Sequence, residues 1–270
     1  MNPKKKVALV TGASSGIGQI AAQHLQAAGY QVYGTSRRGA KAGQYPFPML
    51  VLDVTDDWSV QAAVADLMQR EGQIDLLVNN AGVGIAPAAA EESTLSQVHT
   101  IFDTNVFGTI RVTHAVLPTM RAQQSGRILN VGSALGFIPA PFNAHYCAAK
   151  HAIEGYSEAL DHEVRGFGFR VSVIEPGATS TSFEGSAIPR DKPLDAYDAL
   201  RTKYLVAFNL TMAQADTADS VAQTIVAAAL DKQFTLRYPS GKVAKQGTFA
   251  RRFLPRSLFD KTLHKQFGLA

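Results

Sequence analysis

The sequence predicts an α/β protein with a doubly wound parallel sheet of about seven strands and helices on both faces of that sheet. Short apolar runs rich in β-branched residues alternate with longer helical patterns over most of the 270 residues, which is typical of parallel sheets covered on both sides. The first apolar run is followed by a glycine-rich turn and a helix. No repeat, linker or low-complexity segment divides the pattern, so we expect a single domain over residues 1–240.

The first two strands and the helix between them are the most informative unit. We predict a buried strand over 6–11, a helix over 16–28 that Gly29 ends, and a second strand over 31–35. A βαβ unit of about 30 residues with a glycine turn is the frame of a Rossmann-type dinucleotide site, because the helix N-terminus offers free amides to a pyrophosphate. The phosphate contacts are therefore expected from the residues of this turn, which are Gly12, Ser14, Ser15, Gly16, Ile17 and Gly18.

The spacing of this turn differs from two common phosphate-binding turns. It is Thr-Gly-x-x-x-Gly-x-Gly rather than Gly-x-Gly-x-x-Gly, and no Gly-Lys-Ser/Thr follows, which excludes the P-loop of NTPases. A glycine-rich segment is often only a turn. Here the strand before it and the helix after it favour phosphate binding.

The end of the second strand indicates which dinucleotide is bound. An NAD site places an acid there for the ribose 2′-hydroxyl, whereas residues 35–38 contain Arg37 and Arg38 and no carboxylate. Arginine suits the 2′-phosphate of NADP(H). We expect NADP(H), with Arg37 as the main contact and Arg38 as the second; the alternative is a basic loop on an exposed turn.

The rest of the chain continues the alternation. Further strands are predicted over 48–53, 74–78, 126–133 and 170–174, with a weaker pattern over 234–238. Helices are predicted over 57–70, 93–120, 143–165 and 217–230. Ser93 and Thr217 are the expected N-caps of two of these helices, and Ser96 stands where a capping box usually has an acid. Residues 178–212 show no regular period, and we expect a loop that covers the site.

Polar residues and glycines follow several predicted strands, at the edge of the sheet where ligands of such folds bind. Asp53, followed by Val54, could bond an adenine, or could cap or turn the chain before the next helix. Residues 80–82, Asn-Ala-Gly, suit a ligand crevice or a plain turn. Asn105 lies inside the predicted helix 93–120, where asparagine is unfavourable, so we expect it to have a polar partner or a water.

Tyr146 and Lys150 lie four residues apart in the predicted helix 143–165 and therefore share one helix face. A free tyrosine has a pKa of about 10, and a neighbouring ammonium lowers that pKa. The pair could then exchange a proton near neutral pH, as carbonyl/alcohol chemistry requires. The same spacing also occurs on ordinary helix faces.

Composition and charge exclude several classes of protein. With 46% hydrophobic and 18% charged residues the chain is globular, and its single cysteine, Cys147, excludes an internal disulfide. We expect a cytoplasmic protein without a membrane span. Residues 232–270 hold nine of the 26 Lys/Arg and one acid. The basic extension over 241–270 could meet nucleic acid or an anionic membrane; we favour a solvated or subunit-facing tail and expect no nucleic acid.

The motifs together resemble those of the short-chain dehydrogenase/reductase family in its compact single-domain form. They occur in the order of that family and span most of the chain: residues 11–18, residues 79–82, Asn105, Ser133, Tyr146 with Lys150, and Pro176-Gly177 with Thr181.

The resemblance implies a role for each matching residue. Tyr146 exchanges a proton with the substrate oxygen, Ser133 hydrogen-bonds that oxygen, and Lys150 lowers the pKa of Tyr146 and holds the nicotinamide ribose. Asn105 holds a water that links Lys150 to solvent. The family also implies that no metal is needed and that the chain forms a homodimer or homotetramer. Further cofactor contacts are implied for Pro176, Gly177 and Thr181.

The expected function is an NADP(H)-dependent oxidoreductase that interconverts a ketone or aldehyde and an alcohol. The long extension resembles the steroid- and retinol-active branch of the family, so a bulky apolar substrate is expected. The alternative is a non-catalytic NADP(H)-sensing protein that regulates a partner through its basic tail. Apolar residues that follow Ser133 are expected to line the substrate site, or else to belong to the core or to a subunit contact: Leu135, Phe137, Ile138, Pro139 and Phe142.

Overall fold

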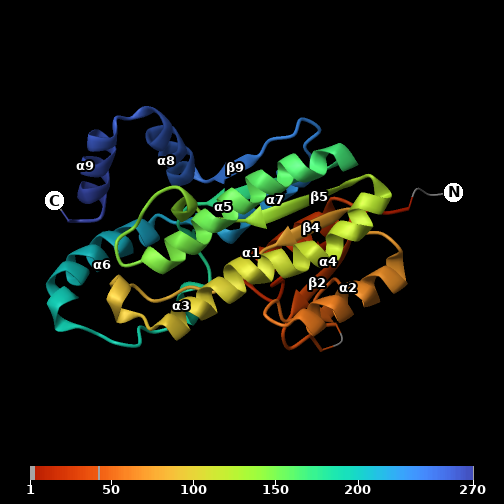
Figure 1. The fold of residues 1–270 in the computed structure, drawn as a ribbon, viewed down its shortest axis with the longest axis horizontal. Coiled ribbons are helices and arrows are strands. Elements are labelled where there is room, and N and C mark those ends of the chain that lie inside the picture. Colours follow the sequence, from red (N-terminus) through yellow and green to blue (C-terminus); the bar gives the residue numbers. More distant parts are fainter. Residues whose placement is uncertain (1–3, 42, 270) are drawn as a thin grey trace.

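A computed structural model of the chain describes residues 4–41 and 43–269 and confirms the predicted fold class. Within these residues, seven parallel strands form one sheet in the order β3-β2-β1-β4-β5-β6-β9 (Figure 1). The strands are β1 (Val7–Val10), β2 (Gln31–Ser36), β3 (Met49–Val51), β4 (Leu76–Asn79), β5 (Gly126–Val131), β6 (Phe169–Pro176) and β9 (Arg237–Ser240). A short parallel pair, β7 (Thr179–Ser180) and β8 (Asp216–Thr217), lies outside this sheet.

Helices cover both faces of the sheet, and each face has its own hydrophobic core. One core contains residues of α2, α4 and α5, and the other contains residues of α1 and α7. The helices are α1 (Gly16–Ala27), α2 (Asp57–Glu71), α3 (Leu95–Phe102), α4 (Gly108–Gln123), α5 (Ala144–Val164), α6 (Asp198–Ala213), α7 (Ala218–Leu230), α8 (Lys242–Phe253) and α9 (Arg256–Gln266).

The order of the strands determines where a ligand can bind. The chain runs outward from β1 to β3 and then returns to place β4 on the other side of β1. Connections therefore leave the carboxyl ends of β1 and β4 in opposite directions, which opens a crevice between them. All four residues of β1 and all four of β4 are buried. The two strands that end at this crevice therefore belong to the packed centre of the sheet.

The helix predicted over 93–120 is divided in the structure. It begins at Leu95, and its N-cap is Thr94, whose hydroxyl accepts a hydrogen bond from the Gln97 amide; the prediction of Ser93 as the cap was wrong. A π-helical turn, Asp103–Phe107, then separates α3 from α4, although the three segments follow one another as one long rod (Figure 1). Turns of this kind are frequent at functional sites, and this one contains Asn105.

Two parts of the chain are more helical than we predicted. The segment expected to be irregular over 178–212 contains α6, and the described part of the extension, residues 241–269, contains α8 and α9 at the same end of the molecule (Figure 1). The last strand lies over 237–240 rather than 234–238. Its late start has a local cause, because the Asp231 carboxylate accepts hydrogen bonds from the Gln233 amide and the Tyr238 hydroxyl and thereby holds a turn before it.

A buried carboxylate fixes the segment that leads into α6. Glu92 is fully buried and accepts hydrogen bonds from the amides of Ala89 (2.7 Å) and Leu194 (2.8 Å). It also pairs with the guanidinium of Arg201 on α6, which is itself 4% exposed. Glu92 thus joins the chain before α3 to the chain before and within α6.

We expect Glu92→Gln to loosen this segment, because the Arg201 guanidinium would stay buried without its main counter-charge. Loss of one partner of a buried ion pair costs about 3–5 kcal/mol. Amide hydrogen exchange over residues 189–213 should become faster while the strands of the main sheet stay protected. The matched control is Glu91→Gln, on an exposed neighbour that bonds only the Tyr197 hydroxyl at 2.5 Å among the contacts described. Equal exchange in α6 for both variants would contradict this role of Glu92.

Candidate active site

A cleft of about 690 Å³ lies at the carboxyl ends of the central strands. Its floor comes from the turns after β1, β2, β3, β4, β5 and β6, and its roof from the chain after β6, α6 and the end of α9. Nearly all the residues predicted from the sequence line this cleft: Gly12, Ser14, Ser15, Gly16, Ile17, Arg37, Asp53, Val54, Asn80, Ala81, Gly82, Asn105, Ser133, Tyr146, Lys150, Pro176, Gly177 and Thr181. Gly18 and Arg38 are the predicted residues that are not part of the lining.

The glycine turn after β1 is held against the end of β4. The Thr11 hydroxyl accepts hydrogen bonds from the amides of Asn80 (2.9 Å) and Ala81 (3.0 Å). In return, the Asn80 side-chain amide donates to the carbonyls of Thr11 (3.0 Å) and Gly12 (3.2 Å). Asn80 therefore positions the turn, and Thr11 is a positioning residue to which we had given no role.

Two glycines of this turn have different tasks. Gly12 has a φ of +65°, and a Cβ there would lie 2.9 Å from the Ala81 Cα, so no other residue fits without a shift. A Cβ on Gly18 would lie 2.5 Å from the Gly12 carbonyl oxygen and 2.3 Å from the Asn80 amide nitrogen. Gly18 thus lets α1 pack against the back of the turn; it lies outside the cleft lining, and its expected contact with the cofactor stays a prediction.

The start of α1 fits a phosphate group. Ser15 is the N-cap, yet its side chain makes no capping hydrogen bond, and the first turn carries no acid. The first backbone amides of the helix therefore have no side-chain acceptor. Anions such as phosphate bind at helix N-termini whose amides are free in this way. Thr181 approaches the same place, with its Cβ 3.6 Å from the position that a Cβ on Gly16 would take.

At the end of β2, the two arginines are placed differently. Arg37 and Arg38 are both exposed, and Arg37 alone of the two lines the cleft. In the next turn, Asp53 accepts hydrogen bonds from the Thr55 amide (3.0 Å) and hydroxyl (2.8 Å). Its carboxylate thus shapes the turn, while Asp56 caps α2.

Ser133, Tyr146 and Lys150 lie on one wall of the cleft, contributed by the end of β5 and the first turns of α5. The Lys150 ammonium donates a 2.8 Å hydrogen bond to the Val131 carbonyl and lies 5.6 Å from the centroid of the Tyr146 ring. The Ser133 hydroxyl accepts a 3.1 Å hydrogen bond from the Leu135 amide, which fixes its place after the strand.

Asn105 is held by a reciprocal pair of hydrogen bonds. Its side chain accepts from the Val83 amide and donates to the Val83 carbonyl, both at 2.8 Å. This contact supplies the polar partner that the sequence led us to expect, and it fastens the π-helical turn to the chain after β4.

Burial dominates the proton affinities in this wall. It raises the pKa of the Tyr146 phenol well above its ordinary value, and the Ser133 hydroxyl offsets part of that rise. The expected lowering of the Tyr146 pKa by Lys150 is therefore not found among the protein's own residues, where the loss of water around the buried phenol dominates. Burial also lowers the pKa of Lys150 to about 8, while the Glu154 carboxylate opposes that change.

An ion cluster that we did not predict lies behind this wall. Glu154, one helical turn after Lys150, accepts a 2.9 Å hydrogen bond from Arg237, whose guanidinium also lies 3.6 Å from Glu175. Burial, together with the charge of Glu154, raises the pKa of Glu175 to about 8. The sequence did contain one sign of this cluster, because Lys150 and Glu154 are four residues apart and so lie on one helix face.

The far half of the cleft is apolar. Leu135 and Ile138 line it as expected. In contrast, Phe142 is buried against Tyr204 and belongs to the core, and Phe137 packs in a cluster with α8 and α9. The Phe183 ring lies 6.2 Å from that of Tyr146. The segment expected to cover the site contributes Tyr204, Leu205, Phe208 and Met212 from α6. Phe267, which follows α9, also lines the cleft, and we had not predicted a place in the site for it.

Comparison with known proteins agrees with this geometry. A family model described as short chain dehydrogenase matches residues 6–192. A 3-ketodihydrosphingosine reductase of Bacteroides thetaiotaomicron is 44% identical over 179 residues, which are 66% of this chain and 65% of that protein. The mouse 17-beta-hydroxysteroid dehydrogenase type 1 is 35% identical over 92% of this chain and 75% of its own length.

A solved structure extends the likeness to nearly the whole chain. A short-chain dehydrogenase from Streptomyces avermitilis superposes with a TM-score of 0.82 and 33% identity, and the match covers 96% of both chains. The family model alone spans more than half of the sequence. The chain therefore belongs to the short-chain dehydrogenase/reductase family of oxidoreductases.

Proposed function

We propose that the protein is an NADP(H)-dependent oxidoreductase that reduces a ketone or aldehyde to an alcohol and catalyses the reverse oxidation. One observation carries this proposal: Ser133, Tyr146 and Lys150 share a wall of the same cleft that begins at the glycine turn. A nicotinamide cofactor bound along this cleft supplies the hydride. The protein's own residues then have to hold the carbonyl and give it a proton.

Tyr146 is the proposed proton donor. Its phenol is protonated at neutral pH, as that of an ordinary tyrosine is, and burial raises its pKa further. The proton can therefore pass only to an oxygen that gains strong negative charge, as a carbonyl oxygen does when a hydride reaches its carbon. The Ser133 hydroxyl donates a hydrogen bond to the same oxygen. Lys150, charged below a pKa of about 8, adds a positive charge to the wall, and we assign to Asn105 a water that returns protons to it.

The cofactor proposal rests on two features of the cleft. The amides at the start of α1 lack a side-chain acceptor and suit a pyrophosphate. Arg37 at the end of β2 suits a 2′-phosphate, and no carboxylate stands in residues 35–38 to prefer a free 2′-hydroxyl. Asp53, Val54, residues 80–82, and Pro176 with Gly177 and Thr181 complete the proposed binding site.

The proposed substrate is a bulky apolar carbonyl compound. The half of the cleft beyond Ser133 is walled by aliphatic and aromatic side chains from several separate segments. Two relatives are named for acting on 3-ketodihydrosphingosine and on a 17-beta-hydroxysteroid. A protein that only senses NADP(H) would not need Ser133, Tyr146 and Lys150 together, and no contact among the described residues favours that alternative.

Replacement of Tyr146 by phenylalanine tests the proton donor. We expect Tyr146→Phe to keep its affinity for NADPH and to lose turnover by roughly 100-fold to 10,000-fold, because the ring stays and the acidic proton goes. NADPH binding by fluorescence titration and ketone-dependent NADPH oxidation are the two measurements. Tyr156→Phe, the same change on the same helix outside the cleft lining, is the control and should stay active. Full activity of Tyr146→Phe would end the assignment.

Charge reversal at the end of β2 tests the cofactor. Arg37→Asp should reduce the preference for NADPH over NADH by roughly tenfold to 100-fold, because a charged hydrogen bond to the 2′-phosphate is worth about 1.5–3 kcal/mol. The ratio of kcat/KM values for the two cofactors measures this. Arg38→Asp makes the same charge change next to the cleft and should move the ratio much less. An unchanged ratio in Arg37→Asp would show that the 2′-phosphate lies elsewhere.

The pH dependence of reduction tests the role of Lys150. Burial lowers the pKa of Lys150 from 10.5 to about 8. Lys150 is therefore fully protonated below this pH and loses its positive charge as the pH rises through about 8. We expect kcat for reduction to be level below about pH 8 and to fall by about tenfold per pH unit above it. Lys150→Arg, which cannot lose its charge in this range, should be slower but lack this alkaline fall. A fall at the same pH in both enzymes would assign it to another group.

A further inference from the structure

Helices α8 and α9 present two contrasting faces. The inner face packs on the protein: Ala244, Phe259 and Leu263 are buried in a cluster with Ala134 and Ile138. The outer face does not. Phe249 and Phe253, one helical turn apart on α8, are 64% and 62% exposed, and their rings lie 4.8 Å apart. Such a pair of exposed aromatic rings on a protein surface marks an interaction site.

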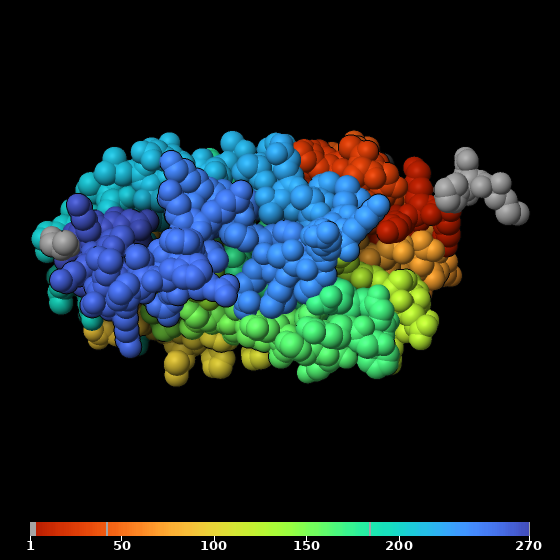
Figure 2. Space-filling model, turned by 90° about the horizontal axis from the view of Figure 1, so that it is seen from above, coloured from red at the N-terminus to blue at the C-terminus, as the bar shows by residue number. Residues whose placement is uncertain are grey.

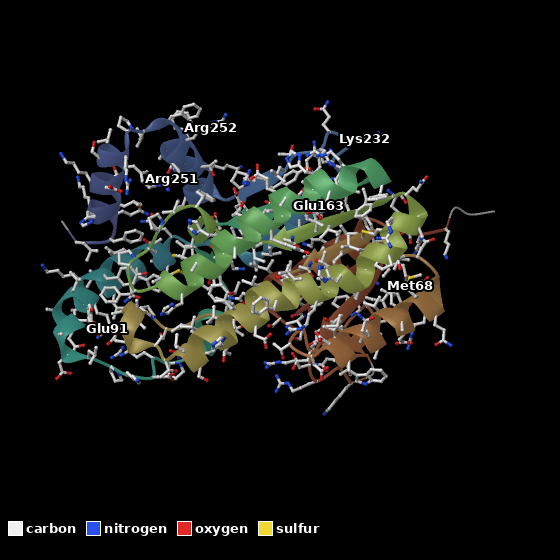
Figure 3. All side chains as sticks on the ribbon, in the orientation of Figure 1. Met68, Glu91, Glu163, Lys232, Arg251 and Arg252 are labelled. Atoms are coloured by element: carbon white, nitrogen blue, oxygen red, sulfur yellow. The ribbon has the colours of Figure 1, made fainter. Side chains whose placement is uncertain are left out.

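The outer face is also strongly basic. Over residues 241–269 Asp260 is the single acid, and in the described part of the chain no cation of these helices belongs to a salt bridge. Arg252 instead lies 5.5 Å from the centroid of Phe253, at the outer edge of α8 (Figure 3). Arg251 lies 5.2 Å from the centroid of the inner Phe259 ring. The other exposed basic side chains of the two helices are Lys242, Lys245, Arg252, Arg256, Lys261 and Lys265.

This surface borders the cleft. Val243 at the start of α8 both lines the cleft and is 39% exposed, and Gln266 with Phe267 at the end of α9 line it as well. On the other side of α9, α6 carries exposed Val206 and Leu210. Figure 2 shows α8 and α9 as a continuous area of the surface beside α6. The helices that carry the basic and aromatic side chains thus also form part of the wall of the cleft.

The outer face of α8 and the adjoining part of α9 form what we name the α8–α9 surface, which consists of Val243, Phe249, Phe253 and Leu258 with the exposed basic residues named above. We propose that the α8–α9 surface docks on an anionic lipid surface. Docking would present the cleft to an apolar carbonyl substrate held in the lipid. The inference deepens the proposed function and rests on it for the substrate. No helix in the described residues has the length and apolar character to cross a bilayer, so the attachment is peripheral.

The chemistry of the surface favours lipid over the other occupants. Aromatic rings beside unpaired arginines and lysines are the composition of helices that lie in the headgroup region of anionic membranes. A second copy that met this surface with the same surface would bring two sets of like charges together, which disfavours a symmetric dimer there. Nucleic acid would satisfy the cations but would leave Leu258 and Val243 without an apolar partner.

The test uses full-length enzyme and vesicles of phosphatidylcholine with or without phosphatidylglycerol. We expect the wild-type enzyme to co-sediment with the phosphatidylglycerol vesicles and to bind the neutral ones more weakly. The double variant Phe249→Ser/Phe253→Ser and the variant Arg252→Glu should each bind about tenfold more weakly or worse. Trp58→Ser, which removes a 79% exposed aromatic side chain from α2, is the control and should bind as the wild type does.

Activity separates this inference from the proposed function. Both surface variants should reduce a water-soluble ketone as fast as the wild type does but lose at least about tenfold in rate on a long-chain ketone dissolved in the vesicles. If the enzyme binds anionic vesicles yet reduces no carbonyl, the docking surface stands and the proposed function fails. The docking inference is overturned if the wild type does not bind anionic vesicles, if the variants bind them equally well, or if the variants only lose self-association or affinity for nucleic acid.

Discussion

The hydroxyl of Thr11 holds together the two halves of the cleft floor. It accepts hydrogen bonds from two consecutive amides after β4, and it is 1% exposed. The Asn80 side chain returns two hydrogen bonds to the turn after β1. Because these groups are buried, breaking one of them leaves another without a partner, which costs more than the bond itself contributes. The glycine turn therefore has one fixed position, from which the whole cleft extends.

A second set of buried polar contacts fixes the opposite wall. The side-chain amide of Asn79 donates to Asn130, and that of Asn130 donates to Ser157 on α5, at 2.9 and 2.8 Å. Together with the bond from Lys150 to the Val131 carbonyl, these contacts hold β4, β5 and α5 in register. The wall with Ser133, Tyr146 and Lys150 and the glycine turn are thus parts of one sheet edge, whereas the apolar roof comes from α6 and α9.

Most of the fold and of the candidate site could be predicted from local sequence patterns. Buried parallel strands are continuous apolar runs, and the glycine turn has a local spacing, so both could be predicted. Helix α6 could not, because its buried face contains Arg201, whose partner Glu92 is 109 residues away. The direction of the Tyr146 pKa also depends on burial by distant segments, and the bond from Arg237 to Glu154 joins residues 83 positions apart.

The central claim is that Ser133 and Tyr146 act on one carbonyl oxygen beside a hydride donor that starts from the glycine turn. A crystal structure of the enzyme with NADP⁺ and an unreactive analogue of the carbonyl substrate tests it most directly. The account predicts that one ligand oxygen lies about 2.6–3.2 Å from both hydroxyls, with the nicotinamide beside it and the pyrophosphate at the start of α1. A ligand oxygen bound away from these two hydroxyls, or a nicotinamide outside the cleft, would contradict it.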